Sequence, residues 1–143
     1  MIIKEFQGEY RFLSNFYPAK VEFEHEIFPT VEHAYQAAKT KEWSKRLYIR
    51  EARTPGEAKR RGRSISIRED WEDIKYDVMS KLVMDKFANN KELKQKLLNT
   101  RDSILQEGNK WGDKIWGIDL KTGKGLNLLG KILMIVRDTL KGV

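Results

Sequence analysis

Hydrophobic and polar positions follow two different rhythms along this chain. In the first third, aromatic and β-branched residues alternate roughly with polar ones, and Ser14-Asn15 and Tyr17-Pro18 are turn signals. This pattern predicts short antiparallel strands within residues 10–16 and 19–28. In the second of these segments apolar residues alternate with three glutamates, as a half-exposed strand requires. We therefore expect a small N-terminal antiparallel sheet.

From Pro29 onward the apolar residues recur at helical spacing. Thr30 is a suitable N-cap for a first helix. Thr54-Pro55-Gly56-Glu57 combines a Thr N-cap, Pro at the first helical position and Glu at the third, and Gly62 is expected to end that helix. A long amphipathic helix is predicted from about Asp70 to Ala88.

Two further helices are predicted in the C-terminal part. Leucines from Leu93 to Leu98 mark the first, which follows the helix-ending pair Asn89-Asn90. Asn127 is expected to cap the last helix, whose inward positions run from Leu129 to Leu140. The expected fold class is α+β, a mainly helical domain with a small N-terminal antiparallel sheet.

Composition narrows the class of protein. The 143 residues are 40% hydrophobic with no Pro-, Gly- or Ser-rich linker, which predicts a single domain over residues 1–143. The absence of cysteine excludes a disulfide scaffold, thiolate metal sites and a cysteine nucleophile. The longest purely apolar run, Ile132 to Val136, is far shorter than the ~20 residues of a membrane span. Since the N-terminus does not resemble a signal peptide, we expect a soluble, cytoplasmic protein.

The net charge of +7 calls for an anionic partner. Between Lys45 and Arg63 there are eight basic residues and two acidic ones. Such a stretch would attract nucleic acid or a phosphorylated small molecule. A solvated helical face explains the same charges, and the sequence leaves both interpretations open.

One face of the first predicted helix carries candidate chemistry. Glu32, Gln36 and Lys39 have the spacing i, i+4, i+7, so they project from the same side. A carboxylate, an amide and an amine in this arrangement fit a catalytic site. They fit a solvent-exposed polar stripe equally well.

The segment from Glu107 to Gly117 is unusual because it gathers two tryptophans, two acidic residues and several glycines. Trp111 and Trp116 could stack on a base, or they could fill the core beneath a loop. Further on, residues 123–127 form a Gly-rich turn before the last helix, where backbone N–H groups could bind phosphate or simply lead into the Asn cap.

The histidines do not indicate a metal site. His25 and His33 lie on different predicted elements, and the chain has no HExxH motif or comparable ligand spacing. We expect no metal and no organic cofactor.

Several motifs, taken in order along nearly the whole chain, resemble the NADAR superfamily, the YbiA-like N-glycosidases. The matching segments are Leu13-Ser14-Asn15-Phe16-Tyr17-Pro18, residues 29–39 with Glu32, His33, Tyr35, Gln36 and Lys39, then Trp71, Lys86-Phe87, Thr100, Glu107, Asp113-Lys114-Ile115-Trp116-Gly117 and residues 125–137. One departure is Asp119, where many members have Gly after Trp-Gly-Ile. An additional carboxylate there would affect substrate preference.

The resemblance implies an enzyme that hydrolyses a ribose C1′–N bond without a cofactor. The implied substrates are phosphoribosylamino-pyrimidine intermediates of riboflavin biosynthesis. A second branch of the family implies removal of ADP-ribose from guanine bases of nucleic acid. Two other functions stay open: a non-catalytic ADP-ribose or nucleotide-binding module, and a general nucleic-acid binder.

Two mechanisms fit these residues. Glu32 and Asp113 could act as a pair of carboxylates, one stabilising charge at C1′ and the other acting as acid or activating water. Alternatively, a neutral Lys39 could attack C1′ of the ring-opened ribosylamine and form a Schiff base, with Glu32 moving protons. We favour the lysine route modestly, partly because the family has a lysine at this position of its motif.

The predicted substrate contacts are of three kinds. Phe16 or Trp116 would stack on the base, and Asn15 and Gln36 would form hydrogen bonds to its edge or to ribose hydroxyls. The arginine candidates for phosphate are Arg61, Arg63 and Arg68. The remaining candidates for substrate binding are His33, Trp71, Gly117 and Asn127.

Overall fold

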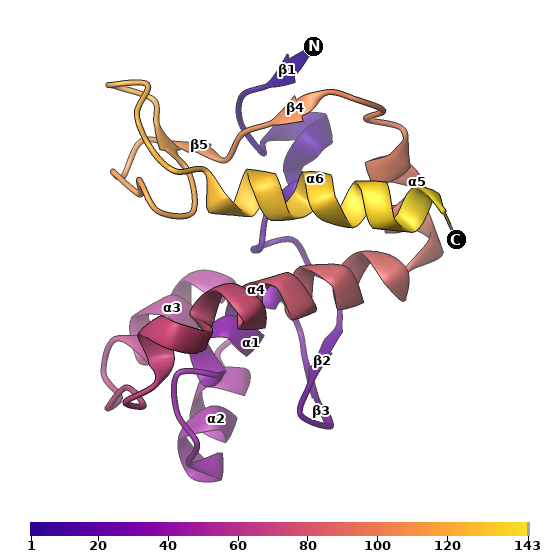
Figure 1. Ribbon diagram of the computed structural model, residues 1–143. Coiled ribbons are helices and arrows are strands. Elements are labelled where there is room, and N and C mark those ends of the chain that lie inside the picture. The colour runs from indigo at the N-terminus through magenta and orange to yellow at the C-terminus, as the bar shows by residue number, and fades with distance from the viewer. Residues whose placement is uncertain (143) are drawn as a thin grey trace. The chain divides into compact units, whose positions relative to one another are not determined.

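The structure is a computed structural model that describes residues 1–142, with about half of them in helices and the rest in short strands and loops (Figure 1). This confirms the predicted α+β class. The chain forms two compact units. Unit 1 joins Met1–Ser14 to the chain from Phe87 onward, and unit 2 is Asn15–Lys86. No helix among the described residues is both long and apolar enough to cross a membrane.

Unit 2 begins with the predicted antiparallel strands. β2 (Val21–Phe23) pairs with β3 (Glu26–Phe28), so that Val21 lies opposite Phe28. Both of these side chains are buried, whereas the turn between the strands places Glu24 and His25 at positive φ. The predicted sheet is therefore this two-stranded hairpin.

The strand predicted within residues 10–16 is wrong. Residues Gly8–Leu13 form a 3₁₀ helix, η1, in unit 1. Phe12 and Leu13 are adjacent and both buried, whereas a strand would point them to opposite faces. The ring of Phe12 packs edge-on against Phe87 at a centroid distance of 6.5 Å. Tertiary packing thus decides the conformation of this segment.

Two helices of unit 2 begin at the predicted caps. The hydroxyl of Thr30 accepts a hydrogen bond from the His33 N–H at 3.1 Å, and that of Thr54 accepts one from the Glu57 N–H at 3.1 Å. The helices of unit 2 are α1 (Val31–Ala37), α2 (Trp43–Arg50), α3 (Pro55–Gly62) and α4 (Trp71–Ala88), the last of which extends into unit 1. The close agreement reflects how local these capping interactions are.

Helix α2 has no counterpart in the sequence prediction. Three of its eight residues are basic, and its buried residues are Arg46 and Ile49. The Arg46 Nε donates to the backbone carbonyl of Thr40 at 2.7 Å, and its guanidinium lies 2.8 Å from the Glu24 carboxylate. Because one of the two buried residues is an arginine held by tertiary contacts, the helix has no regular spacing of buried apolar residues by which it could be predicted.

Unit 1 contains two short parallel strand pairs and two further helices. Ile2 lies opposite Ile104, and Gly108 opposite Ile118. The elements are β1 (Ile2–Ile3) with β4 (Ile104–Leu105), β5 (Gly108–Asn109) with β6 (Ile118–Asp119), and the helices α5 (Lys91–Leu98) and α6 (Leu128–Lys141). Helix α6 packs against α5 and β4, with Leu133 and Leu105 fully buried. The parallel pairs could not be predicted because each strand is only two residues long.

Asn127 occupies the N-cap position of α6, but its side chain does not cap the helix. Its backbone is left-handed, with φ at 54°. The side-chain Oδ1 accepts from the Glu107 N–H at 3.0 Å, and Nδ2 donates to the Leu105 carbonyl at 2.9 Å. The predicted side-chain cap is therefore wrong, because this amide joins α6 to the preceding chain instead.

Candidate functional site

The polar face of α1 is buried. Glu32 is 8% exposed and Gln36 is 4% exposed, and every residue of the helix belongs to the buried class. The hairpin, α2 and α3 all pack against α1. The alternative of a solvent-exposed polar stripe is therefore excluded for these two residues. Burial of a carboxylate and an amide costs free energy unless they are paired, so their arrangement needs a specific explanation.

Gln36 satisfies only part of its hydrogen-bonding capacity. Its Nε2 donates to Glu32 Oε2 at 2.7 Å, one helical turn away. Its Oε1 is buried and has no hydrogen-bond partner among the described residues. Leaving a buried acceptor unsatisfied costs about 1–3 kcal/mol. This oxygen is therefore a ready acceptor for a donor group on a ligand.

Lys39, just beyond the end of α1, has a lowered pKa. The main cause is burial, which disfavours the charged ammonium, and the nearby Glu32 opposes this effect. Three positive charges lower the pKa further: those of Lys59, Arg63 and Lys75. The Nζ also lies 5.8 Å from the centroid of the Tyr35 ring. These surroundings favour a neutral amine, which is the nucleophilic form.

His33 and Trp71 hold α1 in place. The two ring nitrogens of His33 lie 2.8 Å from the Thr30 hydroxyl and 2.9 Å from the Ala52 carbonyl, and burial lowers its pKa. Trp71 is buried and packs against Tyr35 at a centroid distance of 5.0 Å. Contact of either residue with a substrate stays a prediction.

Asn15 connects the motif before the hairpin to α1. Its backbone carbonyl accepts a hydrogen bond from the Glu32 N–H at 3.1 Å, and its side-chain amide lies 3.5 Å from the sulfur of Met79. The neighbouring Phe16 is exposed. The loop with the predicted base-binding residues is thus attached directly to the backbone of the proposed catalytic glutamate.

Two of the three arginines predicted to bind phosphate have strong internal partners. Arg61 donates to the Tyr48 carbonyl at 2.6 Å, and its guanidinium lies 4.5 Å from that residue's ring centroid. Arg68 forms a bidentate pair with Asp70, at 2.6 and 3.0 Å, which raises the arginine's pKa and lowers the aspartate's. Arg63 is exposed at the end of α3. Of the three, Arg63 is the best placed for an anionic ligand.

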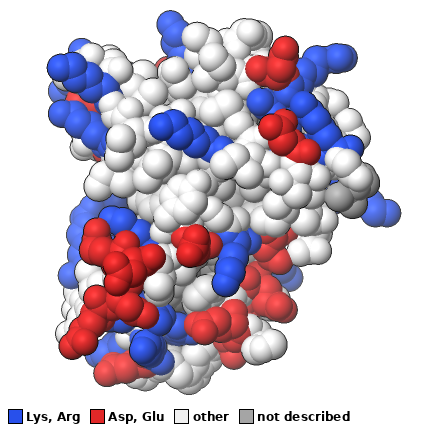
Figure 2. Space-filling view, viewed as in Figure 1, with Lys and Arg blue, Asp and Glu red and all other residues white. Residues whose placement is uncertain are grey.

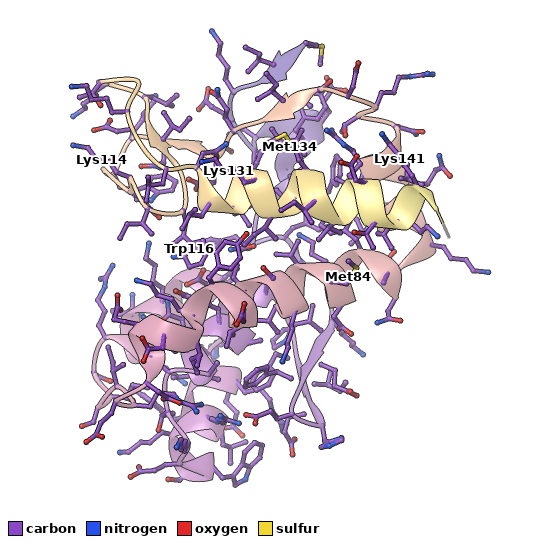
Figure 3. All side chains as sticks on the ribbon, viewed as in Figure 1. Met84, Lys114, Trp116, Lys131, Met134 and Lys141 are labelled. Atoms are coloured by element: carbon purple, nitrogen blue, oxygen red, sulfur yellow. The ribbon has the colours of Figure 1, made fainter. Side chains whose placement is uncertain are left out.

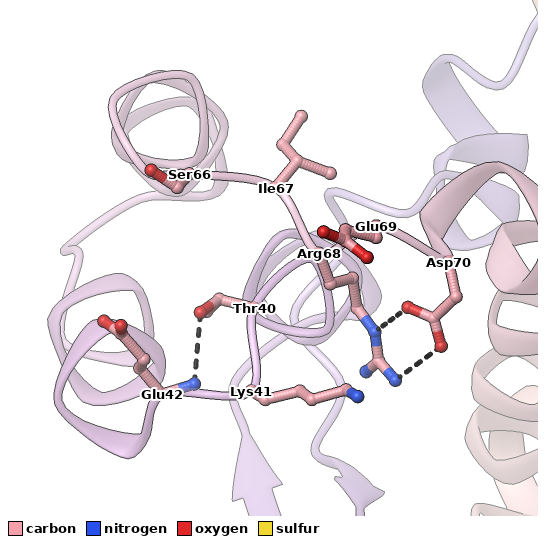
Figure 4. Close-up of a pocket in the computed structure, with 8 residues that line it drawn as sticks. All are labelled: Thr40, Lys41, Glu42, Ser66, Ile67, Arg68, Glu69 and Asp70. Atoms are coloured by element: carbon pink, nitrogen blue, oxygen red, sulfur yellow. Dashed lines mark hydrogen bonds and ion pairs between the residues drawn. The ribbon is translucent and has the colours of Figure 1, made fainter.

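A groove of about 460 Å³ lies beside the Arg68–Asp70 pair (Figure 4). Its lining residues are Thr40, Lys41, Glu42, Ser66, Ile67, Arg68, Glu69 and Asp70. The lining thus holds three carboxylates and two cations, one of which, Arg68, is paired with Asp70 as the dashed lines in Figure 4 indicate. Phosphate, with its own negative charge, is poorly matched to this lining.

In unit 1, residues 107–117 form what we call the tryptophan loop. The side chain of Asn109, which is 1% exposed, holds the loop together by hydrogen bonds. The Asn109 side chain accepts from the Asp113 N–H and donates to the Asp113 carbonyl, both at 2.9 Å, and also donates to Glu107 Oε2 at 3.0 Å. Asp113 Oδ1 in turn accepts from the N–H groups of Ile115 and Trp116, each at 3.0 Å. Asp113 therefore shapes the loop.

The tryptophans of this loop do not both fill the core. Trp111 is 64% exposed, whereas Trp116, which is labelled in Figure 3, is half-buried and lies just before β6 in the sequence. Gly117 is required at its position because a Cβ there would overlap the carboxylate and backbone of Glu107. The explanation that the two rings plug the core therefore fails for Trp111, while base stacking stays a prediction for Trp116.

A family model described as the NADAR domain matches residues 3–141. The chain belongs to the NADAR domain family. Its similarity to N-glycosidase YbiA of Escherichia coli (strain K12) is 37% identity over 134 residues, covering 92% of this chain and 82% of that protein. This chain also resembles the NMR structure of E. coli YbiA, with a TM-score of 0.85 and 34% sequence identity. The superposed region covers 99% of this chain and 84% of the YbiA chain.

This NADAR domain is also similar to two other bacterial proteins. An N-glycosidase of Nostoc punctiforme is 36% identical over 139 residues, which cover 94% of this chain and 88% of that protein. A riboflavin biosynthesis protein of Vibrio vulnificus is 38% identical over 132 residues, covering 91% of this chain. The matched region is only 35% of the Vibrio protein, so this chain spans about a third of that relative.

The predicted site residues of the NADAR domain belong to different units. Unit 2 contains the residues of the first motifs and the arginines, namely Asn15, Phe16, Glu32, His33, Gln36, Lys39, Arg61, Arg63, Arg68 and Trp71. Unit 1 contains Asp113, Trp116, Gly117 and Asn127. Glu32 and Gln36 lie on α1 and Lys39 lies just beyond its end, and the pairing of Glu32 with Asp113 stays a prediction.

Sequence reasoning missed several residues of these sites. Lys59 and Lys75 act electrostatically on Lys39 from other helices, and Asn109 organises the tryptophan loop. The basic composition of residues 45–63 was the only sequence signal for Lys59. No pattern in the sequence indicated a role for Asn109. Across residues 1–142 no group of three or more His, Asp or Glu side chains is arranged to hold a metal ion.

Proposed function

We propose that this NADAR domain hydrolyses the bond between ribose C1′ and nitrogen in a phosphoribosylamino-pyrimidine, the class of intermediate found in riboflavin biosynthesis. Hydrolysis of an N-glycosyl bond is supported by the family, since the relatives that match this chain over most of their own length are named N-glycosidases. The chain is accordingly an enzyme that hydrolyses N-glycosyl bonds. The finer choice of substrate is supported by the relative in Vibrio vulnificus, which is named as a riboflavin biosynthesis protein.

The observation that carries the proposal is the buried polar face of α1. Glu32 is fixed by Gln36, Gln36 Oε1 lacks a hydrogen-bond partner among the described residues, and Lys39 has a lowered pKa. A buried carboxylate, an unsatisfied acceptor and an amine with a lowered pKa have no evident structural purpose together. They match the groups that covalent cleavage of a ribosylamine requires.

The reaction begins when the bond between C1′ and the ring oxygen O4′ breaks, with O4′ taking up a proton supplied by Glu32, so that the ribosylamine opens to an iminium at C1′. The neutral amine of Lys39 adds to C1′, and the resulting ammonium gives a proton to Glu32. Glu32 passes this proton to the pyrimidine-linked nitrogen, which then leaves as the free amine, and a lysine Schiff base remains. Water adds to C1′, the lysine amine departs, and the sugar phosphate closes its ring. Each proton transfer is general acid–base catalysis by the same carboxylate.

Neighbouring residues support this assignment of roles. The Gln36 amide holds one carboxylate oxygen of Glu32, and the backbone of Asn15 holds the Glu32 N–H. The free acceptor on Gln36 suits a sugar hydroxyl or a base N–H of the substrate. Glu32 is thereby restrained in a single geometry while it exchanges protons.

The decisive experiment is turnover in the presence of borohydride. The purified chain is incubated with a phosphoribosylamino-pyrimidine, and release of the free base is followed together with the mass of the protein. We expect release of the base and, after reduction, a ribosyl phosphate adduct that peptide mass spectrometry maps to Lys39. Lys39→Arg and Lys39→Ala should abolish both signals, and Glu32→Gln should slow turnover. Lys45→Ala, an exposed lysine on α2, is the matched control and should behave like the unmodified chain.

The same assay separates the competing functions. Full activity in Lys39→Arg would exclude the covalent route and leave carboxylate catalysis on water. Turnover of ADP-ribosylated guanine in place of the pyrimidine would reassign the substrate. Binding of either compound without release of base would identify a non-catalytic module.

A further inference from the structure

Lys86 occupies an unusual position for a lysine. Figure 2 shows basic side chains that project from the visible face, many of them beside acidic ones. Lys86 is instead 2% exposed, and it is the only lysine of residues 1–142 in the buried class. Removing an ammonium group from water costs free energy, and this desolvation lowers the pKa of Lys86 to about 7. A methionine would fill the same space without that cost, so packing alone does not require an amine here.

The contact between Lys86 and Tyr17 indicates what the amine does. The Lys86 Nζ lies over the Tyr17 ring, 5.8 Å from its centroid. A cation in this position is attracted by the quadrupole of the ring, and the attraction is strongest where the groups are desolvated. Because the pKa is about 7, a substantial share of Lys86 is still an ammonium group at neutral pH. The two side chains therefore join α4 to the segment that precedes the hairpin.

The chain around this segment contacts α4 at two further points. The Asn15 side-chain amide lies 3.5 Å from the Met79 sulfur, and the Glu22 N–H donates to the Asp85 carboxylate at 2.9 Å. Met79 precedes Lys86 by seven residues, or two helical turns, so the two lie on the same face of α4. A thioether is a weak acceptor, and the contact with Asp85 is exposed. Of the three contacts, the one made by Lys86 is therefore the one that uses a buried charge.

The segment that Lys86 holds also reaches the proposed catalytic carboxylate. The Asn15 carbonyl accepts a hydrogen bond from the Glu32 N–H at 3.1 Å. Between Asn15 and Tyr17 lies Phe16, which is 43% exposed and is a predicted stacking partner of the base. A shift of Tyr17 would therefore move both residues that are predicted to contact the base, relative to the carboxylate that exchanges protons.

We propose that Lys86 is a positioning residue: by holding the ring of Tyr17, it fixes the loop of residues 15–18 that binds the base of the substrate. The inference rests on the proposed function and adds a residue that acts on affinity for the base. Since Lys86 acts through Tyr17, it need not touch the substrate itself. Its removal should weaken binding of the base and leave binding of the sugar phosphate and the proton transfers at Glu32 largely unaffected.

Affinity for each half of the substrate tests this role. The values of kcat and KM are measured with a phosphoribosylamino-pyrimidine, and calorimetry gives the affinities for the free aminopyrimidine and for ribose 5-phosphate. We expect Lys86→Met to raise KM and to weaken aminopyrimidine binding by about 10-fold, with kcat and the affinity for ribose 5-phosphate largely unchanged. Lys86→Arg keeps the positive charge and should recover part of the lost affinity. Lys81→Met, at an exposed position of the same helix, should behave like the unmodified chain.

Substitutions of Tyr17 separate its ring from its hydroxyl. Tyr17→Phe keeps the aromatic face and should bind the aminopyrimidine like the unmodified chain, whereas Tyr17→Leu should lose about as much affinity as Lys86→Met. In the variant that combines Tyr17→Leu with Lys86→Met the losses should not add, because both changes remove the same contact. Equal losses in Tyr17→Phe and Tyr17→Leu would show that the hydroxyl matters instead, and would refute the proposal. The Tyr17 pair also decides the question if urea unfolding shows that Lys86→Met does not fold.

The outcomes distinguish this inference from the proposed function. Affinity for the aminopyrimidine that depends on Lys86, in a chain that releases no base, would uphold the positioning role and refute the proposed function. Normal release of base with an unchanged KM in Lys86→Met would do the reverse. A fall in kcat alone would assign Lys86 to the chemical step, and additive losses in the double variant would mean that Lys86 and Tyr17 act independently. Either of these last two results would overturn the positioning role.

Discussion

Gly62 of α3 lies so close to the side-chain amide of Gln36 on α1 that a Cβ at this position would overlap Gln36 Oε1. The same amide donates to Glu32, so the absence of a side chain at Gly62 helps to fix the proposed catalytic carboxylate. A residue that sequence analysis identifies only as the end of a helix is thus part of the support for the site.

Gly62→Ala should therefore impair both stability and activity. The added methyl group must displace Gln36, and overpacking of this kind costs about 1–3 kcal/mol. Turnover is expected to fall by up to about 100-fold, since small displacements of catalytic groups have effects of that size. Denaturant unfolding and steady-state kinetics are the measurements.

The control for this change is Gly56→Ala in the first turn of the same helix. The nearest atom that a Cβ at Gly56 would meet is the Thr54 hydroxyl at 3.9 Å. Because the unfolded chain loses freedom, this variant should be neutral or more stable by about 0.4–1 kcal/mol. Equal losses of activity in both variants would show that the contact with Gln36 is unimportant.

The pH dependence of turnover should follow Lys39. Burial and the neighbouring cations lower its pKa, so kcat/KM is expected to rise with pH and to reach its plateau below the usual 10.5 of a lysine. Lys75→Ala removes a positive charge that disfavours the ammonium, so the pKa of Lys39 and the midpoint of the profile should move upward. Lys81→Ala should leave the midpoint where it is, and a midpoint that is the same in all three proteins would contradict the assignment.

Lys86 should make the stability of the protein depend on pH. Its side chain is 2% exposed, lies 5.8 Å from the Tyr17 ring centroid, and burial lowers its pKa to about 7. The unfolded chain keeps the usual value of 10.5, so between pH 7 and 10.5 the unfolded state binds more protons than the folded state. The free energy of unfolding should therefore rise with pH across this window, and the cost of burial is fully present below it.

Lys86→Met removes the titrating group from this position. Relative to the unmodified chain, the variant should be more stable at pH 7 than at pH 10.5 by several kcal/mol, since one pKa unit corresponds to about 1.4 kcal/mol. The difference should shrink as the pH approaches 10.5. Urea unfolding at several pH values measures it, with Lys81→Met on the same helix as the exposed control. A constant difference at every pH would mean that Lys86 does not titrate in this range.

Asn109→Ala should loosen the tryptophan loop. The change leaves the Asp113 N–H and carbonyl without their side-chain partner, at a cost of about 1–3 kcal/mol. Trypsin should then cut faster at the exposed residues Lys110 and Lys114. Asn99→Ala, an exposed position after α5, should leave the cleavage rate unchanged. Protection equal to that of the unmodified chain would show that Asn109 does not organise the loop.

Features that depend on neighbours along the chain could be predicted from the amino-acid sequence. The N-caps Thr30 and Thr54 were predictable because each bonds to an N–H only three residues away. The common face of Glu32, Gln36 and Lys39 followed from helical periodicity alone. The sequence also contains, in order, the motifs that resemble the NADAR superfamily. The family match over residues 3–141 confirms that the chain belongs to this family.

Tertiary structure decided whether those features amount to a site. Burial of the α1 face depends on the hairpin, α2 and α3, and the charges that act on Lys39 come from residues 59, 63 and 75. The partner of Arg61 is a backbone carbonyl 13 residues away, so this hydrogen bond was invisible in the charge pattern. The parallel pairing of Ile2 with Ile104 joins residues that are far apart in the sequence. Local sequence patterns show which side chains lie on the same helix or strand. Burial of those side chains and the charges that act on them depend on which helices and strands pack together.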